Sequence, residues 1–321
     1  MSTLKDIADS LGVTVSTVSR ALSGSGRISE ATIKRVREEA EKMGYYPNES
    51  ARILKTGQSS MIGVLAPDIT DKFYSRLLKS ISREAAKSGF GVLYCDTGGD
   101  LCAEKNYYNM LRSKNVSGIL IAATGENHIY DAEDTSGIIF IDNLPHPKAD
   151  VCCISIDHEK AGYELTEHLI KNGHRDIAVI TGSMIETSAS ERLSGHLACL
   201  KKYGISKALV YHGDYRFSGG YNAVSEMLKD GLPSAIIAHN HLLAYGAVAA
   251  LKEKSFEIPK NVKLACFDIV DETNIFAPKM TYMISPVDEL GSEAARMMIE
   301  KITSGTDFGG RIFLAHTLIE R

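Results

Sequence analysis

Several features common in proteins are missing from this 321-residue sequence. It contains no tryptophan, which excludes an indole ring as a stacking platform in any binding site. It has no run of about eighteen apolar residues, and no basic segment followed by an apolar one at its start, which excludes a membrane span and a secretory signal. We therefore expect a cytoplasmic protein with no membrane partner.

Cysteine is scarce and scattered. The six cysteines form no CxxC pair, and none lies in a cluster with histidine that has the spacing of a zinc site. Cys95, Cys152, Cys153 and Cys266 lie in apolar runs, which favours packing in a core over redox chemistry.

Motifs of the common enzyme classes are also missing. No GxGxxG follows the first strand-like run, and neither GxxxxGK[ST] nor GxSxG occurs. The sequence therefore predicts no catalytic residues, no metal and no cofactor, and we expect that the protein is not an enzyme.

Length and charge suggest more than one domain. A chain of 321 residues with 44% hydrophobic residues can form two or three domains. The net charge is −4, but residues 1–60 carry nine basic and seven acidic side chains, whereas the remainder carries 27 and 33. This balance permits a DNA-binding head on an acidic body.

After residue 60, short apolar runs alternate with stretches of helical period, such as those near 72–88 and 101–114. Runs that are apolar on both faces and separated by helices are typical of parallel sheets covered on both sides. A pause at 151–162 indicates two doubly wound lobes, so we predict an α/β fold. The runs are MIGVLA (61–66), FGVLYC (90–95), GILIAA (118–123), GIIFID (137–142), DIAVITG (176–182), ALVYHG (208–213), SAIIAH (234–239) and KLACFD (263–268).

Polar residues follow these runs where a cleft is expected, because ligands bind beyond the carboxyl ends of parallel strands. Each one taken alone fits an ordinary turn residue that meets solvent, so only their convergence indicates a site. They are Asp68, Asp96, Asp142, Thr181 to Ser183, Asp214, His239 to His241, and Asp268.

The first 45 residues form a separate pattern of three short amphipathic helices. Thr3 and Asp6 resemble a capping box, Gly12 ends the first helix, and a second helix begins near Val15. A third covers 29–45. Two helices joined by a tight turn match a helix-turn-helix, although a helical cap or a dimerisation module has the same periodicity.

In series, these segments resemble the lactose/galactose repressor family of bacterial transcription regulators. The likeness is carried by TLKDIADSLGVTVSTVSRALSG, YYPNESARILKTG, MIGVLAPDITDKFYS, ERLSG, LLAYGAVAAL and PVDELGSEA, in the family's order. It implies a helix-turn-helix head (1–46), a hinge helix and linker (47–60), and a body (61–321) that folds like periplasmic sugar-binding proteins. The chain would cross three times between an N-lobe (about 61–155 and 287–307) and a C-lobe (about 156–286 and 308–321).

The resemblance assigns DNA contacts to the head. Val15, Ser16 and Arg20 match base-reading positions, and arginine can bond guanine bidentately while valine can meet a thymine methyl. Hydroxyl groups elsewhere in the head can bond phosphate oxygens. They belong to Thr3, Thr14, Ser19 and Thr32. For Thr3 and Thr14, capping a helix is an equal alternative.

The linker resembles the family's hinge helix, which pairs with its dimer mate in the minor groove. Asn48 can cap this helix, Ala51 is small enough for close approach, and Leu54 matches the residue that wedges between base pairs. A flexible polar tether fits the free protein equally well.

By the same resemblance, a small effector binds between the lobes. Asp142, Arg192, Asn240 and Asp268 match effector contacts, and this set suits a polyol. Aromatic walls would come from Phe73, Tyr74 and Tyr215, for which ordinary packing is the alternative.

The chain departs from the family pattern at His196, His241 and Ile269, so an atypical or modified ligand stays open. For His196, His239 and His241 we expect supporting or surface roles and no metal, because they form no cluster with the spacing of metal ligands.

Together these observations predict a homodimeric repressor whose partners are operator DNA and a small effector, expected to be a sugar or sugar derivative. A dimer is expected because no long heptad tail follows the last segment. The direction of the effector's action stays open. A transport-type solute receptor would lack the head, and an enzyme would need a catalytic constellation.

Overall fold

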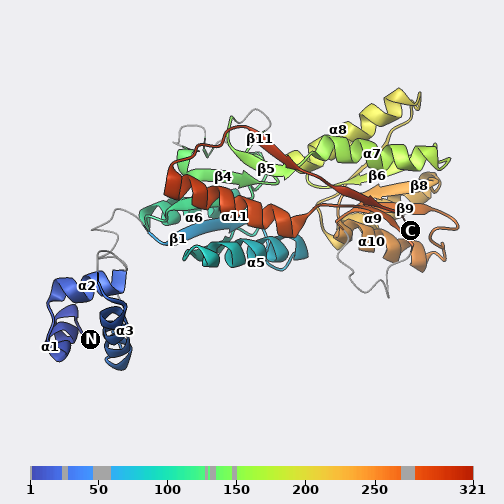
Figure 1. Ribbon diagram of the computed structural model, residues 1–321. Coiled ribbons are helices and arrows are strands. Elements are labelled where there is room, and N and C mark those ends of the chain that lie inside the picture. The colour runs from blue at the N-terminus through green and yellow to red at the C-terminus, as the bar shows by residue number, and fades with distance from the viewer. Residues whose placement is uncertain are drawn as a thin grey trace. The chain divides into compact units, whose positions relative to one another are not determined.

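The computed structural model describes residues 2–23, 28–45, 59–126, 129–130, 135–146, 150–268 and 279–320 (Figure 1). The chain divides into two compact units, Met1–Ser59 and Ser60–Arg321. Each is described by itself. Among the described residues, no helix is both long and apolar enough to cross a membrane.

The head unit consists of α1 (Leu4–Leu11), α2 (Val15–Ser23) and α3 (Glu30–Lys42). Thr3 caps α1 in a reciprocal capping box with Asp6, and Gly12 ends it with a left-handed φ of 65°. The inward faces of the three helices form one small core, which contains Ile7, Ala8, Val18, Ala21, Val36 and Ala40.

The first lobe of the body is built on a six-stranded sheet with the order β11-β5-β4-β3-β1-β2. Helices α5 (Lys72–Lys87) and α11 (Val287–Ser304) lie side by side on one face, and α6 (Leu101–Ser113) covers the other (Figure 1). The strands are β1 (Met61–Ala66), β2 (Gly91–Asp96), β3 (Gly118–Ile121), β4 (Ile138–Ile141), β5 (Cys153–Ile156) and β11 (Arg311–Leu314), and the short η1 (Thr135–Gly137) precedes β4.

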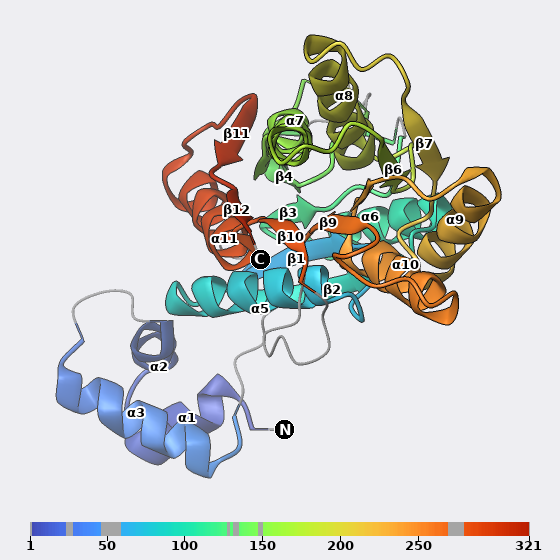
Figure 2. The ribbon, with the colours of Figure 1, turned by 90° about the vertical axis from the view of Figure 1, so that its right-hand side faces the viewer.

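The second lobe repeats this plan with the strand order β12-β10-β9-β8-β6-β7. Helices α7 (His158–Lys171) and α8 (Thr187–Lys202) cover one face, and α9 (Phe217–Asp230) and α10 (His241–Glu253) cover the other (Figure 2). The strands are β6 (Ile177–Thr181), β7 (Leu209–His212), β8 (Ala235–Ala238), β9 (Lys263–Phe267), β10 (Thr281–Ile284) and β12 (Thr317–Ile319).

The central strands of each sheet are buried on both faces because they are apolar at nearly every position. In β4, Ile139 and Ile141 belong to the core under α5 and α11, whereas Ile138 and Phe140 belong to the core under α6. Successive side chains of a strand point to opposite faces, so an unbroken apolar run supplies two cores at once. The predicted α/β fold with two doubly wound lobes behind a three-helix head is confirmed.

Three details differ from the expectation. The pause at 151–162 contains β5 and the start of α7, so it is a strand and a helix. The short strands β10, β11 and β12 have no counterpart among the predicted runs. The range 308–321 was assigned whole to the C-lobe, but β11 pairs with β5 of the first sheet while β12 joins the second. The last crossing therefore follows Leu314, because β11 completes the edge beside β5.

Close packing of α7 on α8 fixes the helix that carries Arg192. A Cβ atom at Gly195 would lie 1.9 Å from the carbonyl oxygen of Glu159, and one at Gly162 would lie 2.2 Å from that of Arg192. Only glycine permits this approach of the two backbones. The contact brings Arg192 within reach of His158 at the start of α7.

Candidate functional site

The head presents the polar face of α2 to solvent. Val15 is 44% exposed, and Ser16 and Arg20 are also exposed, whereas Val18 points into the core. Residues 16 and 20 are one helical turn apart, so they share a face. Ser19 is half-buried between this face and the core.

Of the hydroxyl groups expected at phosphates, those of Thr3 and Thr14 accept hydrogen bonds at helix starts, and that of Thr32 contacts the cap of α3. The Thr3 hydroxyl donates to Asp6 Oδ2 at 2.9 Å, and that of Thr14 accepts from the backbone N–H of Thr17 at 3.2 Å. The hydroxyls of Ser29 and Thr32 are 2.8 Å apart at the start of α3. These contacts hold the helix ends and leave oxygen lone pairs for a second partner.

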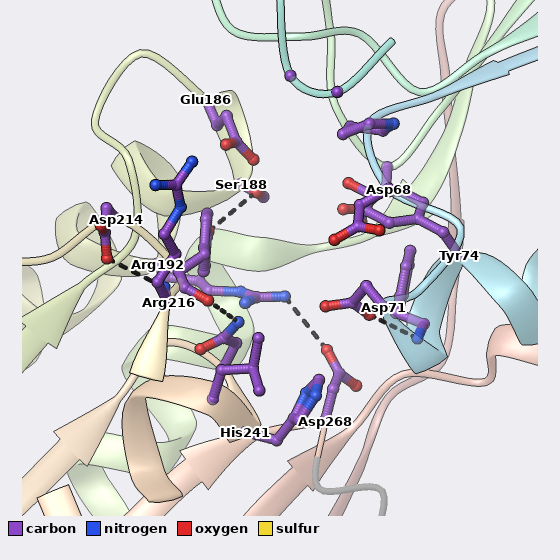
Figure 3. Close-up of a pocket in the computed structure, with 18 residues that line it drawn as sticks. Asp68, Asp71, Tyr74, Glu186, Ser188, Arg192, Asp214, Arg216, His241 and Asp268 are labelled. Carbon is purple, nitrogen blue, oxygen red and sulfur yellow. Dashed lines mark hydrogen bonds and ion pairs between the residues drawn. The ribbon is translucent and has the colours of Figure 1, made fainter. Parts of the chain in front are cut away.

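A cavity of about 240 Å³ lies between the two lobes of the body. Asp68, Asp71 and Tyr74 of the first lobe face Ser188 and Arg192 and other residues of the second across it (Figure 3). All the residues expected at the effector line this cavity: Phe73, Tyr74, Asp142, Arg192, Tyr215, Asn240 and Asp268.

The strand order explains this convergence. Asp142 directly follows β4, Asp268 directly follows β9, and Asn240 lies two residues beyond β8. Parallel strands end at the same edge of a sheet, so polar residues placed after them meet in the cleft. Asp142 and Asp268 have left-handed φ values of 65° and 52°, which turn the chain sharply at the strand ends.

Arg192 is the centre of a buried hydrogen-bond network. Its Nη1 donates to the carbonyl oxygen of His239 at 2.5 Å, and its Nη2 lies 3.4 Å from Asp268 Oδ2. The guanidinium stacks over the ring of Phe267 at 4.2 Å from the centroid. The group is thereby fixed in one orientation, with its donors already partly engaged.

The network continues to the first lobe through His158. Arg192 Nε donates to His158 Nδ1 at 3.3 Å, so Nε2 is the protonated ring nitrogen, and it donates to Asp142 Oδ1 at 3.0 Å. Burial opposes ionisation of Asp142, but His158 and Arg192 outweigh burial and hold the pKa of this carboxyl below its ordinary value.

Asp268 and Asn240 are held from other elements. Asp268 accepts the backbone N–H of Ser285 at 2.7 Å and its hydroxyl at 3.1 Å. Asn240 caps α10 by accepting from Leu243 N at 2.9 Å, and its amide donates to the carbonyl oxygen of Tyr215 at 3.0 Å. Asn240 therefore shapes the cleft wall as well as lining it.

Aromatic rings form two walls. Phe73 and Tyr74 at the start of α5 pack edge to face, with centroids 5.2 Å apart. The Tyr215 ring lies against the backbone of Gly182, where a Cβ atom would be 1.9 Å from Cζ. The Tyr215 hydroxyl is 3.3 Å from that of Ser188, and burial raises the pKa of Tyr215.

Among the polar side chains of the lining, sequence reasoning missed Asp71, Glu186, Ser188 and Arg216. Each lies at or beside the N-terminus of a helix that follows a strand, so this position was the signal that could have found them. Asp68, Asp214 and His241 also line the cavity and belong to the polar set that follows the predicted strands.

Glu186 is a cleft carboxyl with a strongly raised pKa. Burial, reinforced by the negative charge of Asp142, raises the pKa of Glu186 to about 7. Burial also raises the pKa of Asp71 and lowers that of His241. These groups lie in a wall that has an excess of acidic side chains.

His196 and His239 both lie inside the protein. His196 is buried, and its Nδ1 lies 2.9 Å from the Thr166 hydroxyl. His239 is buried behind Arg192, and burial lowers the pKa of both His196, to about 4, and His239. Surface positions for these two are therefore excluded, while His239 supports Arg192. Among the residues that the structure describes, no group of three His, Cys, Asp or Glu side chains could hold a metal ion.

The two lobes share a helix cap beside the cavity. Glu186, at the N-cap position of α8, makes no side-chain cap bond, and Asn143 of the first lobe supplies one instead. Asn143 Oδ1 accepts from Ser188 N at 2.9 Å, and Leu144 N donates to the Thr187 hydroxyl at 2.9 Å. The loop after β4 thus closes the first turn of a helix in the other lobe.

Two family models match the chain. "Bacterial regulatory proteins, lacI family" matches residues 3–48, and "Periplasmic binding proteins and sugar binding domain of LacI family" matches residues 59–321. Together they account for the head and for both lobes with the cavity.

Individual relatives match over their whole length. The ribose operon repressor of Escherichia coli K12 is 32% identical, with 100% of this chain and 99% of the relative covered. The HTH-type transcriptional regulator DegA of Bacillus subtilis is 31% identical, with 92% of this chain and 90% of the relative covered. The Lac repressor dimer bound to operator and an anti-inducer superposes with a TM-score of 0.89 at 25% identity, covering 100% of this chain and 98% of that one.

A helix-turn-helix head joined to a two-lobed body with a cavity between its sheets defines a ligand-responsive DNA-binding regulator. The family models and the relatives agree with that class over almost the whole chain. The chain belongs to the lacI family of bacterial regulatory proteins, and it is a transcriptional regulator.

Proposed function

We propose that the protein is a homodimeric repressor whose affinity for operator DNA is set by a small polyhydroxylated effector in the interlobe cavity. One observation carries the effector half of this proposal: side chains from both lobes meet in a single cavity with hydrogen-bonding groups and aromatic walls. A structure of the CelR regulator is described as its complex with cellobiose, and one relative is a ribose operon repressor, which supports a sugar or sugar derivative.

Each cleft residue has a proposed role. Asp142 and Asp268 accept hydrogen bonds from effector hydroxyls, and Arg192 donates to an effector oxygen. Phe73, Tyr74 and Tyr215 contact the apolar face of the effector's sugar ring. Asn240 has its amide engaged already, so we assign it one remaining contact beside its capping role.

The head has proposed roles as well. Val15, Ser16 and Arg20 read base edges in the major groove, and hydroxyls at the helix starts position the head on phosphates. The phosphate set is Thr3, Thr14, Ser19 and Thr32. For Asn48, Ala51 and Leu54 we keep the hinge-helix prediction, although all three lie outside the described residues.

The lobes couple the two sites. An effector that binds one arrangement of the lobes better than the other shifts their equilibrium. The spacing of the paired N-lobes then sets whether the hinge segments can engage DNA. Such coupling is commonly worth about 1 to 3 kcal/mol. We also propose that the protein acts in the cytoplasm, where its DNA partner lies, and that it binds its effector without catalysis.

The experiment is a selection of binding sites from fragmented genomic DNA by the full-length protein. We expect enrichment of near-palindromic sites, and Arg20→Ala should weaken binding to them by about 1 to 3 kcal/mol, the usual cost of a lost bidentate base contact. Arg37→Ala is the matched control, because Arg37 is exposed on α3. The proposal is wrong if no site is enriched, or if both variants bind as the parent does.

A further inference from the structure

The wall of the cleft carries much more negative than positive charge. Among the residues that the structure describes, two arginines line the cavity, Arg192 and Arg216. Six carboxylates line it with them, and they come from both lobes (Figure 3): Asp68, Asp71, Asp142, Glu186, Asp214 and Asp268.

The arginines do not neutralise this excess. Arg192 forms an ion pair with Asp268, and Asp142 accepts a hydrogen bond from His158. The other four carboxylates form no ion pair with any residue that the structure describes. Lys72 lies in an adjoining hollow with Asp71 and His241. Its side chain is exposed, and so are those of Arg216, Asp68 and Asp214, so solvent screens the charges of all four.

Two of the unpaired carboxyls are costly to ionise without a partner. Glu186 accepts a hydrogen bond from the Asn143 amide at 3.3 Å, and burial raises its pKa to about 7. Burial also raises the pKa of Asp71, which caps α5 by accepting from Phe73 N at 2.7 Å. A cation in the cleft would relieve this cost for both groups.

The arrangement does not suit a metal ion. In the part of the chain that the structure describes, no three of these groups converge as ligands would. The carboxylates are distributed around the cavity, on elements that follow different strands. The compensating charge therefore belongs to a molecule large enough to fill the cavity.

We propose that the effector carries a protonated amine in addition to its hydroxyl groups, as an amino sugar does, and that it carries no phosphate. This inference rests on the proposed function, because it specifies the ligand of the same cavity. The amine would bond Glu186 and its neighbours, while the hydroxyls would meet Asp142, Asp268 and Arg192. A phosphate would face uncompensated carboxylates on both walls.

The test uses matched ligands that differ at a single carbon. Isothermal titration of the full-length protein compares glucose, 6-amino-6-deoxyglucose and glucose 6-phosphate, and then glucose, galactose and mannose with their 2-amino forms. The best amine should bind at least about tenfold more tightly than its neutral parent, as expected for a charge-assisted hydrogen bond. Calcium chloride serves as a probe for a simple cation site and should show no saturable binding.

Glu186→Gln keeps the shape of the side chain and its hydrogen bond to Asn143 while removing the charge. It should abolish most of the preference for the amine, measured as the ratio of the affinity for the amine to the affinity for its neutral parent in the same variant. Glu226→Gln is the matched control, because Glu226 is exposed on α9 outside the cavity. Circular dichroism confirms that both variants are folded.

The outcomes separate this inference from the proposed function. If a neutral sugar or a sugar phosphate binds best, or if no amine binds at 10 mM, the inference is overturned, while operator selection by the same protein still decides the regulator proposal. If an amine binds best and Glu186→Gln removes its advantage, the inference stands. An unchanged preference in Glu186→Gln would also overturn the assignment of the amine to this carboxylate.

Discussion

Glu186 lies in the ligand cleft in an environment that disfavours its negative charge. Burial and the negative charge of Asp142 raise the pKa of its carboxyl to about 7. Arg192, Tyr74 and Tyr215 also lie close enough to interact with it electrostatically. A folded protein that holds a proton more tightly than the unfolded chain loses stability as the pH rises through that interval. The free energy of unfolding should therefore fall between about pH 4.5 and pH 7 because of this residue.

Removing the carboxylate should stabilise the protein at high pH. At pH 8 we expect Glu186→Gln to raise the free energy of unfolding by roughly 1 to 3 kcal/mol, because the buried charge is gone. At pH 5, where the folded protein holds Glu186 protonated, the two proteins should differ little. Urea unfolding at both pH values measures this, and an equal effect at both would contradict the environment described for Glu186.

Individual residues show how far sequence reasoning reaches. Asp142, Asn240 and Asp268 could be placed in the cleft because they follow apolar strands, and the ends of such strands can be predicted from the local sequence. Glu186 and Asp71 could not, because a carboxylate before a helix is usually a solvent-exposed cap. What makes them distinctive is the opposite lobe, which buries them.

At the scale of elements, α8 depends on a residue outside its own lobe. Asn143 Oδ1 caps the first turn of α8 through Ser188 N, and Asn143 is 1% exposed. Because the cap of α8 lies across the cleft, the stability of its first turn depends on the separation of the lobes. The bond forms only when the loop after β4 approaches α8.

Asn143→Ala should therefore affect both stability and ligand binding. We expect a loss of about 1 to 2 kcal/mol in the free energy of unfolding, because the N–H of Ser188 and the hydroxyl of Thr187 both lose Asn143 Oδ1 as their acceptor. We also expect the affinity for the effector to change by at least about threefold, since losing this bond between the lobes shifts the equilibrium between their arrangements. Urea unfolding and isothermal titration provide the measurements.

The matched control is Asp100→Ala. Asp100 caps α6 by accepting from Ala103 N at 2.7 Å, within one lobe and on an exposed turn. It should lower stability by a similar amount and leave effector affinity unchanged. If Asn143→Ala behaves like Asp100→Ala in both assays, the cap has no part in coupling the lobes.

At the scale of the whole molecule, the last strands bind the lobes together. After β11 completes the first sheet, β12 joins the second, and Arg311 on β11 forms a bidentate ion pair with Glu191 on α8 at 2.6 and 2.9 Å. Both partners are partly buried, so the pair is less screened than a surface ion pair. The pair is sensitive to the relative position of the lobes.

Arg311→Gln should alter the coupling between effector and operator. Coupling is reciprocal, so the factor by which effector changes operator affinity must equal the factor by which operator changes effector affinity. We expect both factors to change together by about threefold to tenfold, which corresponds to about 1 kcal/mol. Two titrations, each performed with and without the second ligand, measure them.

Arg296→Gln provides the comparison, because Arg296 pairs with Glu293 on the same helix, α11, and spans no cleft. It should leave both factors unchanged. Equal behaviour of the two variants would show that the ion pair between β11 and α8 is not part of the coupling.

The sequence by itself determined the local elements and the polar residues that end them. Hydrophobic period, glycine turns and capping residues act within a few residues, so strands such as Met61–Ala66 and helices such as Lys72–Lys87 could be read directly. The family motifs added the order of head and lobes. The strands β10, β11 and β12 escaped because each has only three or four residues and begins with a polar one, so none forms an uninterrupted apolar run.

Only the tertiary structure decided the full set of side chains that share the cleft and the balance of charge among them. The six carboxylates lie far apart in sequence, and their excess over arginine appears when two sheets bring their carboxyl edges together. The cap of α8 by Asn143 and the ion pair between Arg311 and Glu191 likewise join separate lobes. Electrostatic and hydrogen-bond energies depend on distance and burial in space, and neither quantity is encoded in local sequence.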